Sequence, residues 1–514
     1  MESLTNPVIC VGVMTHPGLP VTWALGVGVA LLAVAVRAVF APAPGGAHSL
    51  RVALPHLPGP RWGLTVIKAL VAAVFLMVIV AGLWGSPLPE RNLATTLTWT
   101  VWWTVVILSV FFLGSAWCAV CPWDTLAGWL VNRRFVGQGD DATRLHLKVP
   151  GFLRSVWPAL GLFVGLTWLE LGVGVTMDPA ATALLALVMV VLAVSSLAVF
   201  ERKAFCRYFC PVGRTIGFYA QLAPVALRPV DAEVCARCTS LECYHGTKSI
   251  APCPTHLTMG RLTQNTYCTS CGNCATACPS GNVAWQGRSM AAEAGTGARP
   301  HWDEAWFMLG LLALTSFHGV TMMSWWESSV QTLGRMIGDS GRFLVTFSFG
   351  LAVSMAVPVA AYAVAVAVTQ RLVATNAAGV PSARKAVSYR KRFSALAFAV
   401  LPVAFAYHLS HNLIHLSHDT GTLVGTLGNP LGVGSLPLTR IEHHLLALHP
   451  LLPEAVLSAL QAGLMVWGFW LAARILHQRG RELVGWRRLP MLVFLGGMTA
   501  FNVWLLTHDM VMRT

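Results

Sequence analysis

The residues best suited to chemistry are the cysteines, and their densest run lies between Cys235 and Cys278. Its second half reads Cys268-Thr-Ser-Cys271-Gly-Asn-Cys274-Ala-Thr-Ala-Cys278-Pro279. This C-x2-C-x2-C-x3-C-P spacing is typical of four-iron clusters, because three close thiolates bind one cluster and the fourth reaches a second. Zinc sites usually pair two C-x2-C arms across a spacer, so the run fits an iron–sulfur cluster better than zinc.

The first half of this run is more widely spaced, and Cys253 precedes Pro254 at its end. If the last cysteine of each half binds the cluster of the other half, the run predicts two [4Fe-4S] clusters, each with four cysteine ligands. The expected ligands are Cys235, Cys238, Cys243 and Cys278 for one cluster, and Cys268, Cys271, Cys274 and Cys253 for the other. A pair of zinc knuckles, or thiols that only pack, is the alternative interpretation.

Two further cysteine pairs end apolar runs of the chain. They are Cys118 with Cys121, before Pro122, and Cys206 with Cys210, before Pro211. Each proline turns the chain where a helix stops. The two pairs together could ligate a third cluster or another soft metal, act as redox-active dithiols, or simply end the helices.

Histidines are concentrated in the second half of the chain. Four of them, spaced by three, four and three residues, share one face of a helix; they are His408, His411, His415 and His418. His318 and His508 are expected near the same end of neighbouring helices. Polar side chains within membrane helices are costly and usually face a site.

Three interpretations of these histidines remain open. Haem b would take two imidazoles from different helices, with His318, His408, His415 and His508 as candidates. A copper, zinc or iron site would use the cluster on the helix and its neighbours, namely His411, His415, His418, His443 and His444. In the third interpretation, the histidines bind only backbone, water or lipid headgroups.

The composition predicts the elements that position these residues. Of 514 residues, 55% are hydrophobic and 11% charged, whereas soluble domains carry about 25% charged residues. Ten apolar runs are long enough to cross a bilayer, which takes roughly 20 helical residues. They fall at 21–40, 62–84, 93–117, 151–172, 180–200, 303–323, 342–368, 393–416, 453–475 and 490–510. The expected fold is therefore an all-α polytopic membrane protein with a small two-cluster insert.

The net charge of +14 does not indicate nucleic-acid binding, because the basic residues are concentrated in every second loop between the apolar runs. One set of alternate loops holds 30 of the 35 Lys and Arg residues. Basic loops stay on the cytoplasmic side, so the cysteine-rich insert is expected to be cytoplasmic and both termini outside. No basic leader with a cleavage site precedes the first apolar run, so no cleaved signal peptide is expected.

These observations divide the chain into four parts. We expect a five-helix membrane module at 1–200, a cysteine-rich domain at 201–285, a flexible linker at 286–302 and a histidine-rich five-helix module at 303–514.

The segments Trp117–Phe135 and Phe205–Gly213, with the double cysteine run, resemble the membrane-bound ferredoxins of the NapH/NosR type. The resemblance covers roughly residues 60–285, and CcoG-like proteins form a related branch. It implies a multi-pass protein of the bacterial inner membrane with cytoplasmic four-iron clusters in a ferredoxin-like domain. Members of the family pass electrons between quinol or cytoplasmic donors and periplasmic reductases, whereas the CcoG-like branch serves metal reduction.

The expected function is electron transfer from cytoplasmic clusters, reduced by a soluble donor or by quinol, to an outer haem or quinone site or a periplasmic acceptor. If the chain is an enzyme, it is an oxidoreductase that resembles a quinol dehydrogenase component. The expected partners are membrane lipid, a soluble or periplasmic redox protein and a quinone. A copper reductase or maturation factor and a redox-sensing regulator are the alternatives.

Overall fold

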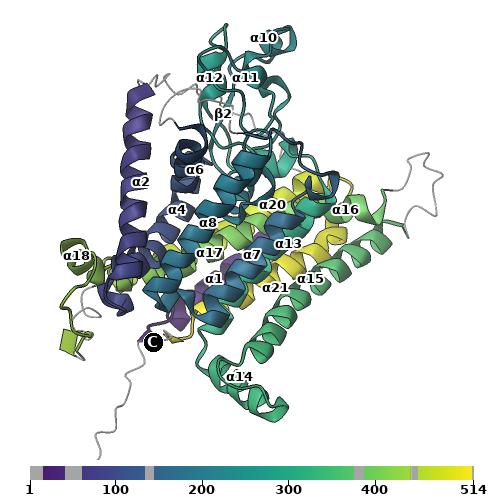
Figure 1. Ribbon diagram of the computed structural model, residues 1–514. Helices are drawn as coiled ribbons and strands as arrows, with labels where there is room; N and C mark the ends of the chain where they lie inside the picture. Colours follow the sequence, from purple (N-terminus) through teal and green to yellow (C-terminus); the bar gives the residue numbers. More distant parts are fainter. Residues whose placement is uncertain are drawn as a thin grey trace, which may run out of the picture.

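The computed structural model describes residues 15–40, 61–133, 144–374, 387–439, 441–442 and 450–511, and it is mostly helical (Figure 1). Within these residues, eight helical segments are long and apolar enough to cross a membrane. They are Val21–Phe40, Gly63–Trp84, Leu93–Leu113, Pro179–Val199, Leu344–Ala374, Tyr389–Asp419, Glu454–Arg479 and Gly485–Leu506. They match eight of the ten expected spans and indicate a membrane protein.

The two remaining apolar runs form different structures. Helix α7 (Trp157–Trp168) and its π-helical continuation η5 (Leu169–Val173) end at Gly174, whose φ of 79° stops the helix before a full span is reached. Helix α13 (Trp302–Thr321) has the length and apolar character of a span only together with α14 (Ser324–Ile337), and the two are bent by 89°. Two acidic residues in its first turn shorten the apolar part of α13.

The other helices of the bundle have the following bounds. Before the cysteine-rich insert come α1 (Val21–Phe40), α2 (Arg61–Trp84), α3 (Leu93–Thr95), η2 (Thr96–Trp102), α4 (Trp103–Leu113), α5 (Trp117–Val120), α6 (Pro122–Asn132), α8 (Pro179–Val199), η7 (Phe205–Phe209) and α9 (Pro211–Tyr219). After it come α15 (Leu344–Ala374), α16 (Tyr389–Leu396), η10 (Ala397–Val400), α17 (Leu401–Asp419), α18 (Gly421–Gly428), α20 (Glu454–Arg479), η11 (Gly485–Arg488) and α21 (Leu489–Leu506).

Helix α17 lies at the centre of the bundle. In the span that includes it, 94% of the most apolar stretch is buried inside the protein. It packs against α20, α13, α21 and α4, and the N-terminal helix α1 packs against α20 and α21. Helices from before and after the insert therefore share one bundle instead of standing as two separate groups.

The cysteine-rich insert sits at one end of this bundle (Figure 1). Strand β2 (Val225–Pro229) pairs antiparallel with β3 (Val283–Gly287). Between the strands, three short helices carry or adjoin cysteines; they are α10 (Ala232–Ala236), α11 (Glu242–His245) and α12 (Asn273–Ala277). Its small core consists of Leu227, Met259 and Val283.

Residues 286–302 differ from the flexible linker expected from their small, polar sequence. Strand β3 continues to Gly287, and the π-helical turn η9 (Glu293–Gly297) follows. Glu293 is 4% exposed and forms ion pairs with Arg228 and Arg288. Its other carboxylate oxygen accepts the Asn265 backbone N–H at 2.7 Å. A buried carboxylate with these partners fixes the segment against the insert.

The two ends of the described chain meet at the opposite end of the bundle from the insert (Figure 1). Strand β1 (Thr15–His16) pairs antiparallel with β4 (Met510–Val511). The backbone N–H of Leu19 also donates to Leu506 at 2.6 Å. This pairing places His16 beside the end of the last long helix.

Candidate metal centres

The insert brings four of its cysteines together at α10 and α11, farthest from the bundle; we call them the distal set. Cys235 lies on α10, Cys238 follows it, Cys243 lies on α11, and Cys278 ends α12. Burial raises the pKa of Cys243, and the charges of the other three cysteines, all close by, raise it further. A chain that assembles four thiols in this way has the donor set of a four-iron cluster.

The other four cysteines of the insert line a single pocket of about 320 Å³; we call them the proximal set. They are Cys253, Cys268, Cys271 and Cys274. Leu227 and Met259 form part of the same wall. Burial raises the pKa of Cys268 to about 11, so a free thiol there is protonated at neutral pH, and metal binding is needed to make it a thiolate.

Several N–H groups point at the sulfurs of both sets. The backbone N–H of Leu257 donates to Cys253 Sγ at 3.2 Å, and that of Ser270 donates to Cys268 Sγ at 3.4 Å. Asn282 donates its backbone N–H to Cys278 Sγ and its side-chain amide to Cys235 Sγ, both at 3.4 Å. Such bonds stabilise thiolate charge and set the potential of a bound cluster, so the sites fit iron–sulfur ligation.

The distal and proximal sets are neighbours. Cys243 and Cys278 of the distal set pack against the same small apolar core as Cys274 of the proximal set. Helices α11 and α12, which carry Cys243 and Cys274, are in contact. The two sets therefore share one wall.

The third group combines the two cysteine pairs at helix ends; we call it the membrane set. Three of its members, Cys121, Cys206 and Cys210, line a pocket of about 360 Å³. The fourth, Cys118, is half-buried. Burial raises the pKa of Cys118 to about 12, with a further contribution from Cys210. Since each pair comes from a different part of the chain, the fold joins what the sequence presents separately.

Proline and local charge shape this third site. Pro122 begins α6 directly after Cys121, and Pro211 begins α9 directly after Cys210. Cys210 Sγ accepts the Gly213 N–H at 3.2 Å, as an N-cap residue does. Burial alone would lower the pKa of Lys203, but Asp124, whose carboxylate lies 2.6 Å from the Lys203 ammonium, raises it above its usual value.

The proximal set rests directly on the membrane set. Ser115, just before the first pair, lies 2.7 Å from Ser270 between their hydroxyl oxygens. Arg202 donates to the Cys253 carbonyl at 2.9 Å. Arg214, 1% exposed, donates to the Cys206 carbonyl at 2.7 Å and also bonds the Thr266 carbonyl. The three sets thus form a series from the tip of the insert to the end of the bundle.

Helix α17 contributes three of the predicted histidines to one cluster, namely His411, His415 and His418, and α13 contributes His318. His411 Nε2 lies 3.4 Å from His415 Nε2, and the ring of His318 lies 5.0 Å from that of His411. His418 follows one turn later on the same helix and is 9% exposed.

His408 and His508 lie outside this cluster. His408 Nδ1 lies 3.2 Å from the hydroxyl oxygen of Tyr219, and its ring lies 5.6 Å from that of Trp103. His508 contacts Trp504 and Thr507. His443 and His444 fall outside the residues that the structure describes.

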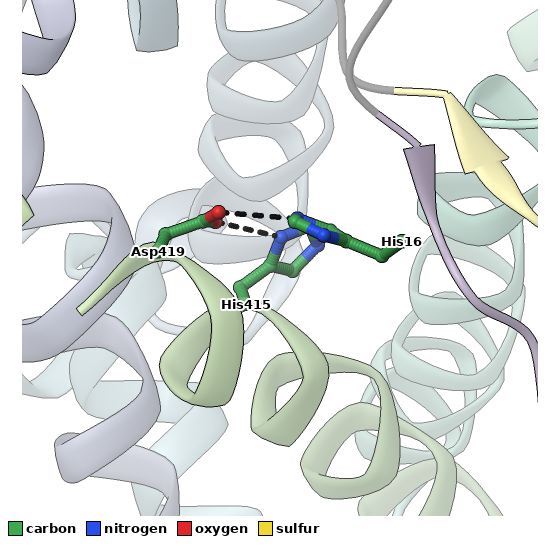
Figure 2. A group of neighbouring side chains, drawn as sticks. All are labelled: His16, His415 and Asp419. Atoms are coloured by element: carbon green, nitrogen blue, oxygen red, sulfur yellow. Dashed lines mark hydrogen bonds and ion pairs between the residues drawn. The ribbon is translucent and has the colours of Figure 1, made fainter. Parts of the chain in front are cut away.

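Two members of the cluster were not among the sequence candidates. His16 Nε2 lies 3.1 Å from Asp419 Oδ1, and His415 Nδ1 lies 3.3 Å from Asp419 Oδ2 (Figure 2). Asp419 could have been found, because it follows His415 by four residues and so shares its helix face. No spacing pattern marks His16, since it is placed by the pairing of β1 with β4.

A series of aromatic rings connects the membrane set with the start of the histidine face. Trp117, next to Cys118, and Trp123, in the wall of the second pocket, both contact Trp102, with ring centroids 6.0 and 5.8 Å apart. Trp102 contacts Trp103 at 5.6 Å, and Trp103 contacts His408. These tryptophans pack inside the bundle instead of only anchoring helix ends.

Comparison with known proteins supports an iron–sulfur role. A family model described as a 4Fe-4S binding domain matches residues 95–136 and 181–224, which contain all four cysteines of the membrane set. The Escherichia coli (strain K12) protein YccM, named as a candidate electron transport protein, is 35% identical over 91 residues. That match spans 17% of this chain and 22% of the relative, so the chain covers about a fifth of the relative's length. No solved structure matches this chain. These similarities indicate an iron–sulfur protein of the electron-transport kind, without specifying the NapH/NosR type.

Proposed function

We propose that this protein is a membrane-bound electron carrier that holds an iron–sulfur cluster at each of its three cysteine sets. The observation that carries the proposal is their arrangement: the distal, proximal and membrane sets adjoin in that order. The match to a 4Fe-4S binding domain at the membrane set supports a third cluster there, in addition to the two expected from the insert. Clusters bound at these positions would supply one-electron redox chemistry.

The protein residues do three things for such clusters. Four thiols per set supply the ligands, and N–H groups such as those of Leu257 and Gly213 stabilise the thiolate charge. Lys203 and Arg214 place positive charge beside the membrane set. Apolar walls, including Leu227 and Met259, limit water around the sulfurs.

The direction proposed is from the insert towards the histidine end. The charge bias of the loops supports a cytoplasmic position of the insert in a bacterial cell, where a soluble donor or quinol would reduce it. The series Trp117, Trp102, Trp103 and His408 runs from the membrane set into the bundle. We infer that an acceptor is reached on the other side, at the histidine cluster or on a periplasmic protein.

The geometry of the histidine cluster fits a metal ion better than haem b. A bis-histidine haem needs two imidazoles that face each other across the porphyrin. The His411 ring instead packs against both His318 and His415, each 5.0 Å away between centroids, and is 2% exposed. A second candidate function follows from this arrangement: reduction or delivery of a metal such as copper, with the cysteine sets as the electron source.

The test is the iron content of purified full-length protein and its variants, measured with low-temperature spin resonance after reduction. We expect three four-iron clusters, and loss of one cluster in each of the Cys243→Ser, Cys274→Ser and Cys206→Ser variants. Cys10→Ser is the matched control, since Cys10 is the one cysteine of the sequence outside the three sets. Zinc in place of iron in the wild-type protein would contradict the proposal.

A further inference from the structure

Three side chains at the far end of the bundle meet as metal ligands do. One nitrogen from each of His16 and His415 and one carboxylate oxygen of Asp419 all lie within 4.8 Å of one another (Figure 2). They come from two distant parts of the chain: His16 lies on β1, and His415 and Asp419 lie in the last turns of α17. Their convergence is therefore a product of the tertiary fold and not of one helix face.

The group is buried, and its hydrogen bonding is incomplete. His16 is 6% and His415 8% exposed. His16 Nε2 is 3.1 Å from Asp419 Oδ1, yet it has no partner with hydrogen-bond geometry in the described part of the chain. A buried nitrogen without a hydrogen bond is unusual in a native protein and calls for a further partner such as an ion.

Two more imidazoles surround the three ligands. His418 stacks on His16 with ring centroids 4.8 Å apart, and His411 Nε2 lies 3.4 Å from His415 Nε2. His418 Nε2 and His411 Nδ1 are buried and have no hydrogen-bond partner among the described residues. Four imidazoles lie around a single carboxylate, and a cation bound by that carboxylate would give a partner to nitrogens that otherwise lack one.

We propose that His16, His415 and Asp419 bind a first-row divalent transition-metal ion, with His411 and His418 as flanking groups. Imidazole nitrogen is a donor for zinc, copper, iron and nickel, whereas magnesium and calcium take oxygen donors. Three protein ligands leave at least one coordination position open, as in sites where the metal acts on a bound molecule. Asp419 supplies the negative charge for the ion.

This inference deepens the proposed function, because it names the kind of group at the outer end of the route. The existence of the site does not depend on the clusters, since none of its residues contacts a cysteine set. The two proposals can therefore be tested separately. Iron content tests the cysteine sets, and a non-iron metal or an additional metal equivalent per chain tests this site.

The experiment uses full-length protein in detergent, with total metal content measured by mass spectrometry and Zn²⁺ binding measured by calorimetry. We expect one high-affinity Zn²⁺ equivalent per chain in the wild-type protein. His16→Ala and Asp419→Asn should each weaken it by at least about tenfold. The iron content of the cysteine sets should be unchanged in both variants.

His508→Ala is the matched control, because His508 lies at the same end of the bundle but contacts Trp504 and Thr507. It should bind Zn²⁺ as the wild type does. A conservative third variant, His415→Gln, keeps side-chain volume and separates ligand loss from misfolding, which thermal unfolding monitors. Equal Zn²⁺ affinity in the wild type and in His16→Ala, or no Zn²⁺ binding by the wild type, would overturn the proposal.

Discussion

Tyr219 and His408 form a buried hydrogen bond, with 3.2 Å between the Tyr219 hydroxyl oxygen and His408 Nδ1. Tyr219 ends α9, the helix that begins directly after Cys210, and His408 begins the histidine face of α17. Both side chains are buried. One hydrogen bond thus connects the helix that follows the membrane set with the helix that carries the histidine cluster.

Replacing Tyr219 by Phe should destabilise the protein by about 1–3 kcal/mol, because a buried His408 nitrogen loses its partner. The measurement is thermal unfolding of the purified protein, with iron content unchanged. Tyr407→Phe is the control, since the Tyr407 hydroxyl is buried without a hydrogen-bond partner among the described residues. A drop of the same size in both variants would mean that the Tyr219 hydrogen bond is not the cause.

Gly319 lies where α13 meets α17, and a methyl group there would come within 1.8 Å of the Tyr407 hydroxyl oxygen. Gly319→Ala should therefore cost about 1–3 kcal/mol through overpacking. Gly497→Ala on α21 is the matched control, because its added methyl meets no atom within 4 Å. If both variants unfold at the same temperature, α13 and α17 can move apart with no loss of stability.

Glu293→Gln should loosen residues 286–302 from the insert, because it leaves Arg228 and Arg288 without their shared buried carboxylate. Breaking a buried pair from one side typically costs about 3–5 kcal/mol. Since Glu293 also accepts the Asn265 N–H just before Cys268, we expect loss of iron from the proximal set. Glu233→Gln, an exposed change in the same insert, should keep its iron. Full iron retention in both variants would argue against this role for Glu293.

Trp102 touches three other tryptophans, so Trp102→Leu interrupts the aromatic series without removing a ligand. In proteoliposomes, we expect several-fold slower reoxidation of reduced protein by ferricyanide added on the histidine side. Reoxidation by ferricyanide on the insert side should be unchanged. Identical rates from both sides in wild type and variant would exclude this route.

Loop charge predicts that the insert and the histidine end face opposite compartments. Alkaline phosphatase fused after residue 511 should be active in bacterial cells, because it would be exported. The same enzyme fused within the insert should be inactive, and green fluorescent protein there should fluoresce. The reverse pattern would invert the proposed direction of electron flow.

The sequence predicted the parts of the structure that depend on local pattern. Eight apolar runs form helices of spanning length, and the spacing of His411 and His415 placed them on one face. Cys253, Cys268, Cys271 and Cys274 line one pocket of the insert, and the assignment of ligands to clusters stays a prediction. That these groups hold clusters stays a prediction.

What the sequence could not give depends on contacts between distant segments. Residues 286–302 were predicted to be a linker because the segment is rich in small residues. Its one carboxylate, Glu293, pairs with Arg288 nearby and with the distant Arg228, and the second pairing has no sequence signal. The sequence left open whether the two cysteine pairs at helix ends act together, because the meeting of Cys118 with Cys210 requires helix ends from two parts of the chain to pack together. His16 joins its partners only through the pairing of β1 with β4.

That pairing also sets an order of events during biosynthesis. Residues 15–16 leave the ribosome long before their partner strand, Met510–Val511, is made. His16 cannot be fixed beside Asp419 until the whole bundle between them has been inserted. The cysteine sets have no such requirement, because their residues are all synthesised in the first 278 positions. A newly made chain would therefore complete its cysteine sets before its histidine cluster.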